Sequence, residues 1–324
     1  MKILGPTQLD AAETFVWLSG RLLERLRFAF LFRGGPRERV LAALRPYQNA
    51  DGGFGEALEP DFRGPVSQPT TAEQALRLLD EIALFDDPIV HRICDYLATI
   101  SLPDGGVPTM LAHVPRYPHA PWWEPGKGEP RASLLPTAGI AGLLHKHRVD
   151  HPWLAPATEF CWAAIDDLTD APASLGLPYV IRFALAFLDH VPDRQRAERA
   201  VAALGRQALR IKAVALDPQT SGEVHFVLDY APEPQTLARR WFDDNLIEKH
   251  LDALVDAQQD DGGWSINWPT WTPITGLEWR AWQTIQRLKT LRAYDRLPSA
   301  ATAGPGSPGT PKAGAEPGSR ARVT

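Results

Sequence analysis

The sequence is poor in cysteine, in basic clusters and in long apolar runs, and each shortage excludes a class of protein. Its 324 residues include two cysteines, Cys94 and Cys161, without a CxxC pair, so we expect no disulfide framework and a reducing compartment, the cytoplasm. The net charge of -5, without a basic run, argues against a nucleic-acid partner. Residues 15–32 form an apolar stretch that four charged residues interrupt. We therefore predict no signal peptide and no transmembrane segment, while peripheral membrane contact stays open.

Helix signals are abundant, and the composition of 44% hydrophobic and 23% charged residues is typical of a soluble globular protein. Apolar periodicity and capping residues predict helices at residues 10–32, 36–48, 70–85, 88–100, 134–147, 155–168, 176–190, 193–212, 236–258 and 276–294. Residues 222–230 (GEVHFVLDY) have some strand character. Residues 298–324 are rich in Ala, Gly, Pro and Ser and are expected to be disordered. We predict one domain over 1–297 and a tail over 298–324.

A short glycine motif occurs three times. It reads YQNADGGFGEALEPD at residues 47–61, SLPDGGVP at 101–108 and QQDDGGWSINWP at 258–269. Asp51 and Asp104 are 53 positions apart, and Asp104 and Asp261 are 157 apart, close to three times that interval. Because an array keeps its period where its signature has decayed, two further units are expected between the second and third copies.

The predicted helices are of two kinds. Those before the glycine motifs, or at equivalent places, are amphipathic, as at residues 193–212, whereas 134–147 and 176–190 are apolar nearly all round. An outer layer facing water and an inner layer facing the protein explain this difference. We predict an all-α fold, an α/α toroid of about five to six helical hairpins, whose inner helices line a cavity. An open solenoid is the competing arrangement, but its inner helices should be more polar.

The glycine motif resembles the repeat of squalene and oxidosqualene cyclases and of protein prenyltransferase β subunits. The matching residues are Gln48, Asp51, Gly52, Gly53 and Phe54 in the first copy, and Gln259, Asp261, Gly262, Gly263 and Trp264 in the last. It is also similar to bacterial proteins of about this length that share DGGFGxxLEPD and DGGWxxxWPxWxP followed by EWR. The resemblance implies a terpenoid cyclase-like toroid, in which the Gln and the aromatic ring join neighbouring helix ends.

The catalytic motifs of that superfamily do not transfer. The cyclases protonate their substrate with a DxDD motif, which the sequence lacks, and the Asp, Cys and His zinc ligands of the prenyltransferases are not matched by Cys94 or Cys161. Asp166, Asp167 and Asp170 spell DDxxD, which binds diphosphate through magnesium in ionising terpene synthases. They are candidate metal ligands, and Mg²⁺ is the candidate cofactor. A solvated acidic helix end is the other interpretation.

The acidic loop after the first glycine motif, GEALEPDFRGP, supplies the candidate catalytic residues Glu56, Glu59 and Asp61. A loop between an outer and an inner helix lies near the rim of the predicted ring, where a side chain can reach the cavity. A carboxylic acid desolvated there and held by Arg63 can act as general acid or base. A salt-bridged turn is the alternative.

Tryptophans dominate the rest of the predicted site. Several rings around one apolar hollow can stabilise a carbocation or bind an ammonium group, at about 0.5–2 kcal/mol per contact. Packing of proline-rich loops is the alternative use of the same rings. Glu278 and Arg280 are candidates to orient a ligand, and His113, Tyr117 and His119 belong to a long loop that could act as a lid. The candidate substrate-binding residues are Arg63, Trp122, Trp123, Trp264, Trp268, Trp271, Glu278, Trp279 and Arg280.

Three function classes follow. The first is an isoprenoid-handling lyase or isomerase, in which a carboxylic acid starts carbocation chemistry on an apolar small molecule. The second is a carbohydrate-active toroid enzyme with paired carboxylates. The third is a noncatalytic toroid that binds a ligand or a protein. We favour the first, with Glu59 or Asp61 as the acid.

Overall fold

The computed structural model describes residues 1–126, 128–174 and 176–297, which form twelve α-helices. The predicted tail, 298–324, lies outside the described residues. Strand pairing within the described ranges is limited to isolated bridges, so the all-α prediction is confirmed. The helices are α1 (Pro6–Ser19), α2 (Leu22–Arg33), α3 (Arg37–Leu44), α4 (Pro69–Glu81), α5 (Ile89–Ile100), α6 (Leu134–Lys146), α7 (Leu154–Leu168), α8 (Leu177–Leu188), α9 (Arg194–Arg210), α10 (Val227–Tyr230), α11 (Asp244–Asp256) and α12 (Pro273–Ala293). Four 3₁₀ helices join them, η1 (Arg45–Tyr47), η2 (Val114–Arg116), η3 (Pro121–Trp123) and η4 (Leu237–Trp241).

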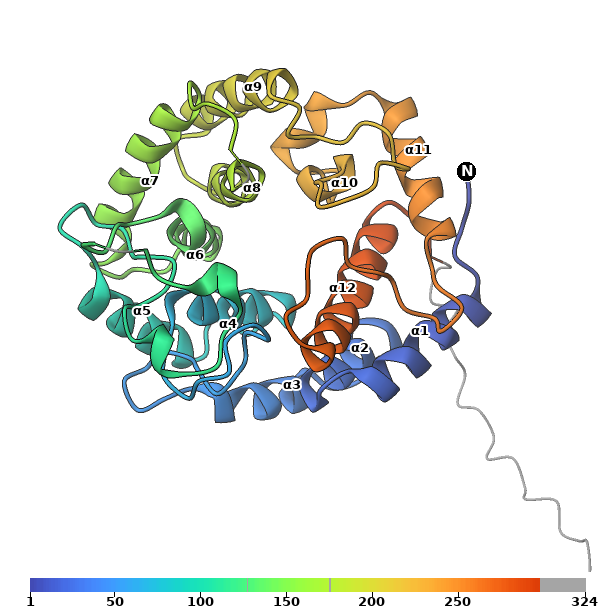
Figure 1. Ribbon diagram of the computed structural model, residues 1–324, viewed down its shortest axis with the longest axis horizontal. Helices are drawn as coiled ribbons and strands as arrows, with labels where there is room; N and C mark the ends of the chain where they lie inside the picture. Colours follow the sequence, from blue (N-terminus) through green and yellow to red (C-terminus); the bar gives the residue numbers. More distant parts are fainter. Residues whose placement is uncertain (127, 175, 298–324) are drawn as a thin grey trace, which may run out of the picture.

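The helices alternate between two layers. In Figure 1 the odd-numbered helices lie on the outside and the even-numbered helices lie inside them. The outer helix α9 shows how the sequence sets this pattern, since it is amphipathic and begins where the Asp193 carboxylate accepts a hydrogen bond from the Arg196 N–H at 3.0 Å. The two units expected between the second and third glycine motifs correspond to the hairpins α7–α8 and α9–α10.

Each glycine motif joins an outer helix to an inner one and packs against another outer helix. Gly52, Gly105 and Gly262 have left-handed backbones, with φ near +90°. A Cβ atom on Gly262 would lie 2.2 Å from the carbonyl oxygen of Ala11 on α1, and the other two glycines press equally closely on α5 and α7. Only glycine permits both the conformation and the contact. The third motif therefore connects the last hairpin to the first helix of the chain.

The motif aspartates act within these loops. The carboxylates of Asp51, Asp104 and Asp261 each accept a hydrogen bond from the backbone N–H two residues later, at 2.9, 3.2 and 3.0 Å. The Gln48 amide donates to the Gly52 carbonyl at 3.0 Å. In the last copy the equivalent donor is Gln258, at 2.8 Å from the Gly262 carbonyl, and not Gln259, which was predicted. The spacing of three residues between Gln and Asp, the same as in the first copy, identifies the correct residue.

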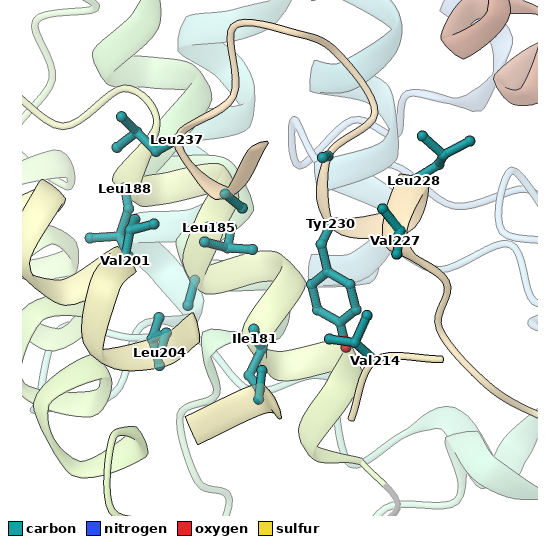
Figure 2. Close-up of a cluster of buried hydrophobic side chains, with 14 of the residues drawn as sticks. Ile181, Leu185, Leu188, Val201, Leu204, Val214, Val227, Leu228, Tyr230 and Leu237 are labelled. Atoms are coloured by element: carbon teal, nitrogen blue, oxygen red, sulfur yellow. The ribbon is translucent and has the colours of Figure 1, made fainter. Parts of the chain in front are cut away.

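The apolar core fills the space between the two layers. Figure 2 shows part of it, where side chains of inner helix α8 meet those of outer helix α9 and of the segment around α10. The labelled residues are Ile181, Leu185, Leu188, Val201, Leu204, Val214, Val227, Leu228, Tyr230 and Leu237. A second cluster packs α3, α4 and α5 together. Because burial of one such side chain contributes about 1.5–3 kcal/mol, these clusters hold the layers together.

Two predicted elements differ from the structure. Residues 10–32 form two helices instead of one, because the chain turns at Gly20, where an added Cβ would lie 3.3 Å from the Cβ of Ala281 on α12. Residues 222–230 do not form a strand. One bridge joins Ala215 to Phe226, after which α10 begins, and the Asp229 carboxylate caps it by accepting from the Phe226 N–H at 2.8 Å.

The inner helices are more polar than predicted. Arg27 on α2 is fully buried and forms an ion pair at 2.7 Å with Glu81 on α4, and its guanidinium lies 4.1 Å from the ring of Trp282 on α12. Lys289 on α12 also pairs with Glu81, at 2.9 Å. Charged side chains of three inner helices thus meet one another, because each finds an opposite charge there.

The two ends of the described chain lie side by side. The Leu4 N–H donates to the Arg296 carbonyl at 2.8 Å, and the buried Arg296 side chain donates to the Lys2 carbonyl at 2.6 Å and pairs with Asp252 at 2.8 Å. The first residues are thereby fixed to α11 and to the residues after α12. Among the described helices, none combines the length and the apolar composition needed to cross a bilayer. A cytoplasmic location stays a prediction.

Candidate functional site

The acidic loop at residues 55–65, with the three residues after it, connects the first glycine motif to inner helix α4. Its first residues, Glu56 and Ala57, have left-handed backbones with φ of 54° and 60°. The Arg21 guanidinium holds this turn by donating to the carbonyls of Ala57 and Leu58 at 2.7 and 3.0 Å, and Glu24 binds the same guanidinium at 2.9 and 3.0 Å. Such a bidentate ion pair fixes the arginine, so the loop is anchored to the start of α2.

Glu59 is the most strongly perturbed acid of this loop. Its side chain is buried, with 3% of its surface exposed, and it accepts a hydrogen bond from the Gln74 amide on α4. Burial, followed by the charge of Asp61, raises the pKa of Glu59 from 4.5 to about 8, although Arg21 and the Gln74 amide act in the opposite direction. Glu59 therefore keeps its proton at neutral pH.

Asp61 faces a set of indole rings. The indole N–H of Trp279 on α12 donates to Asp61 Oδ2 at 2.9 Å, whereas the buried Oδ1 has no hydrogen-bond partner among the described residues. Burial raises the pKa of Asp61, and the indole groups of Trp279, Trp122 and Trp271 partly offset this effect. The buried indole N–H of Trp271 also lacks a hydrogen-bond partner among those residues. The indole N–H groups of three tryptophans thus converge on the Asp61 carboxylate.

Arg63 connects the acidic loop to α12. Its guanidinium binds Glu278 through two contacts of 3.3 and 2.7 Å, and Glu278 is nearly buried. Because Glu278 and Trp279 are neighbours on α12, the ion pair and the Trp279 hydrogen bond fix the loop to the same helical turn. The structure thereby brings together four predicted site residues, Asp61, Arg63, Glu278 and Trp279, that are up to 218 residues apart in the sequence.

The long loop at residues 101–133 covers the acidic loop. The Arg63 N–H donates to the Pro118 carbonyl, and the Ala120 N–H donates to the Asp61 carbonyl, both at 2.8 Å. Trp122 in η3 is 44% exposed, and Trp123 packs against the small apolar cluster that contains Phe62. The predicted covering position of this loop agrees with these contacts, while opening of the loop as a lid stays a prediction.

The histidines of this loop lie at its contacts. His119 bridges the Tyr117 carbonyl and the Glu124 carboxylate, each at 2.7 Å, and these contacts raise its pKa. The imidazole of His113 lies 2.7 Å from the Gln68 amide, and burial lowers its pKa. Both imidazoles therefore have local partners that explain their positions.

Several predicted residues lie apart from Asp61. Trp264 is 2% exposed and donates to the Leu254 carbonyl at 2.8 Å, so it belongs to the core between α11 and α12. Arg280 pairs with Asp261 at 2.8 Å and lies over Phe15, which places it at the third glycine motif. Trp268 packs edge-on against Trp279, with ring centroids 5.7 Å apart, so it extends the aromatic set. The Glu56 side chain is exposed.

The predicted metal ligands lie at the end of an outer helix. No group of three His, Cys, Asp or Glu side chains is placed to hold a metal ion in the part of the chain that the structure describes. Asp166, Asp167 and Asp170 are exposed on or just after outer helix α7, and Asp166 pairs with Arg196 at 2.8 Å. These carboxylates are exposed, as at other acidic helix ends, and their use as metal ligands stays a prediction.

Two residues that position the acids were not predicted. Arg21 precedes α2, far from the acidic loop in the sequence, and Gln74 lies within α4, the helix that follows the loop. Arg21 is one of the four charged residues in the apolar stretch 15–32, where a charged side chain needs a partner. That surplus of charge was a signal, but it did not indicate which loop the arginine would bind.

Comparison with known structures identifies the fold. The sequence matches no protein-family model and no curated protein sequence. A protein from Actinoplanes is similar, with 20% identity, 89% coverage of each chain and a TM-score of 0.54. The type II terpene cyclase MstE from Scytonema is similar in its apo form, with 13% identity, coverage of 90% of this chain and 89% of that one, and a TM-score of 0.52.

An Arg-to-Ala variant of MstE bound to its substrate, geranylgeranyl dihydroxybenzoate, has 12% identity, coverage of 89% and 97%, and a TM-score of 0.53. The chain therefore has the fold of type II terpene cyclases over about nine tenths of its length.

Proposed function

We propose that residues 1–297 form one domain, a closed α/α toroid of six helical hairpins, that acts as an isoprenoid cyclase or isomerase. The contact between Gly262 and Ala11 supports closure, because it repeats at the chain ends the contact that the other glycine motifs make within the chain. The likeness to type II terpene cyclases supports the class of activity. An apolar small molecule with carbon–carbon double bonds is the proposed substrate.

The proton comes from the carboxyl pair Glu59 and Asp61. The observation that carries this proposal is the buried Glu59 side chain, whose pKa of about 8 leaves it protonated at neutral pH. A general acid must hold its proton at the working pH and must lie where water does not compete. Asp61, which accepts a hydrogen bond from the Trp279 indole among several aromatic rings, is the carboxyl that we expect to contact the substrate.

The aromatic rings stabilise the cation that protonation creates. Addition of a proton to an alkene carbon leaves a positive charge on its neighbour, and loss of a proton elsewhere completes an isomerisation without change of composition. Trp279 and Trp268 form an edge-on pair next to Asp61, with Trp122 and Trp271 close by. Cation–π contacts with such rings contribute about 0.5–2 kcal/mol each.

Incubation in deuterium oxide tests this function. The purified protein is given squalene, linear prenyl diphosphates and geranylgeranyl dihydroxybenzoate, with and without magnesium, and products are separated by chromatography and weighed by mass spectrometry. We expect a product that carries one deuteron. Glu59→Gln and Asp61→Asn should each reduce its formation at least about a hundredfold, within the range that general acid catalysis contributes.

The matched control is Glu159→Gln, because Glu159 is an exposed carboxylate on outer helix α7. It should retain the turnover of the wild type. Unchanged substrates under every condition, or full turnover by both acid variants, would remove the basis for this function.

A further inference from the structure

A second polar layer lies on the inner helices below the acidic site. Arg77 on α4 pairs with Glu73 and its guanidinium lies 5.2 Å from the ring of Phe183 on α8. Arg287 on α12 pairs at 2.9 Å with Asp229 on α10. Four of the inner helices therefore direct charged side chains toward one another, and the arginines are the larger part of them.

Arg182 on α8 connects the two pairs. Its guanidinium contacts His225, four residues before Asp229, and the ring of its neighbour Phe183 lies against the Arg77 guanidinium. Nevertheless no carboxylate of the described residues lies within 4.0 Å of it, and its guanidinium donates to His225 Nδ1 at 3.4 Å. Arg182 is a guanidinium without an ion-pair partner in the described chain.

His225 accepts from Arg182 and brings no negative charge. Arginine can only donate, so His225 Nδ1 accepts, and the imidazole is neutral. Burial, followed by the charge of Arg182, lowers the pKa of His225 to about 4, in agreement with that state. Its ring packs edge-on against Tyr179 at 4.4 Å, and the Tyr179 hydroxyl donates to the exposed Glu223 at 2.9 Å. The histidine thus orients Arg182 without neutralising it.

The carboxylates of the layer are already engaged. Asp229 accepts from Arg287 with one oxygen and from the Phe226 N–H with the other. Glu73 is bound by Arg77, and burial raises its pKa, which weakens it as a counterion. Both carboxylates are therefore paired with other arginines, and neither is paired with Arg182.

The layer is also accessible. The Arg77 side chain is 41% exposed and Arg182 is half-buried, although both lie on helices enclosed by the outer layer. Solvent therefore reaches their guanidinium groups within the inner layer. A planar guanidinium that is partly desolvated and lacks a counterion binds carboxylate or phosphate oxygens strongly, through paired hydrogen bonds.

We propose that Arg182, flanked by Arg77 and Arg287, binds an oxyanion group, a phosphate or a carboxylate, of a small-molecule ligand. This site is distinct from the acidic site, because Trp279 beside Asp61 and Arg287 are eight residues apart on α12, a rise of about 12 Å. It does not depend on the proposed chemistry, and failure of either leaves the other standing.

Isothermal titration calorimetry at constant ionic strength tests the site, with inorganic phosphate, inorganic pyrophosphate and benzoate as probes. We expect at least one probe to bind the wild type and Arg182→Gln to weaken that binding at least about tenfold, as expected for loss of a charge-assisted hydrogen bond. The matched control is Arg196→Gln, on outer helix α9, which should bind as the wild type does. Comparison of the three probes distinguishes phosphate from carboxylate recognition.

Arg182→Lys is a second test variant, which keeps the proposal testable if Arg182→Gln misfolds. It keeps the charge and loses the paired geometry, so it should fold and bind with intermediate affinity. Absence of binding of all probes at millimolar concentration would overturn the proposal. Equal affinity of the wild type and both Arg182 variants, or equal loss in Arg196→Gln, would do the same.

Discussion

The buried proton on Glu59 makes a quantitative prediction about stability and pH. The pKa of Glu59 is about 8 in the folded chain. When the chain unfolds, the pKa takes its ordinary value of 4.5. Between these values the folded state holds one proton more than the unfolded state, so the free energy of unfolding falls as pH rises. Outside the interval, Glu59 adds no pH dependence. Integration from pH 5 to pH 8 gives a loss of about 3–4 kcal/mol.

Glu59→Gln removes the ionisation but keeps the shape and a hydrogen-bonding group. Urea unfolding of the wild type and the variant at pH 5, 6, 7 and 8 gives the difference in free energy of unfolding at each pH. We expect this difference to move in favour of the variant by about 3–4 kcal/mol across the series. The raised pKa of Glu73, which is not coupled to Glu59, contributes to both proteins and largely cancels.

The control is Glu159→Gln, at an exposed position on outer helix α7. Its difference from the wild type should stay within about 0.5 kcal/mol at every pH, as is usual for surface substitutions. A difference between Glu59→Gln and the wild type that does not change with pH would show that Glu59 is ionised in the folded chain. The proposed proton source would then be wrong.

Three further substitutions test the frame around the site. Gly262→Ala should lower the free energy of unfolding in urea by about 3 kcal/mol or more, because the backbone is left-handed and the new Cβ meets α1. The control is Gly34→Ala, whose backbone is also left-handed but open to solvent, and it should lower that free energy by about 1 kcal/mol. Arg27→Met should cost about 3 kcal/mol by thermal unfolding, since a buried carboxylate loses a partner, and an unchanged melting temperature would contradict this. Arg21→Gln should raise the pKa of Glu59 further, and carboxyl ¹³C NMR titration that shows a lower pKa would count against it.

The fold could be predicted because its signals are local and repeated. The residues of a glycine motif are enough to predict a turn between helices. The interval between Asp104 and Asp261 was enough to predict two hairpins that lack the motif. Capping residues such as Asp193 gave helix starts for the same reason. The break at Gly20 was missed, although an added Cβ there would meet the local Val16 carbonyl oxygen at 2.7 Å before it met Ala281 on α12 at 3.3 Å.

The candidate site was predictable only in part. The acidic loop stood out because it holds three carboxylates without an apolar pattern, and Arg63 and Glu278 were both selected, although not as partners. Their pairing depends on how α12 meets the loop, which no single segment encodes. Arg182 was not predicted as a site residue, because a single charged residue in an apolar helix gives no signal by itself. Its role depends on charged residues of the neighbouring helices, which only the fold brings close.

The hydrogen bond between Leu4 and Arg296 has a consequence for how the chain can be reordered. A short linker could connect residue 297 to residue 1 without moving either, and new ends could be cut at the exposed turn between α6 and α7, near Asp150. Such a permuted chain would begin with a different hairpin and still place the acidic loop beside α12. The hairpins would then be synthesised in a different order and would still adopt the same arrangement.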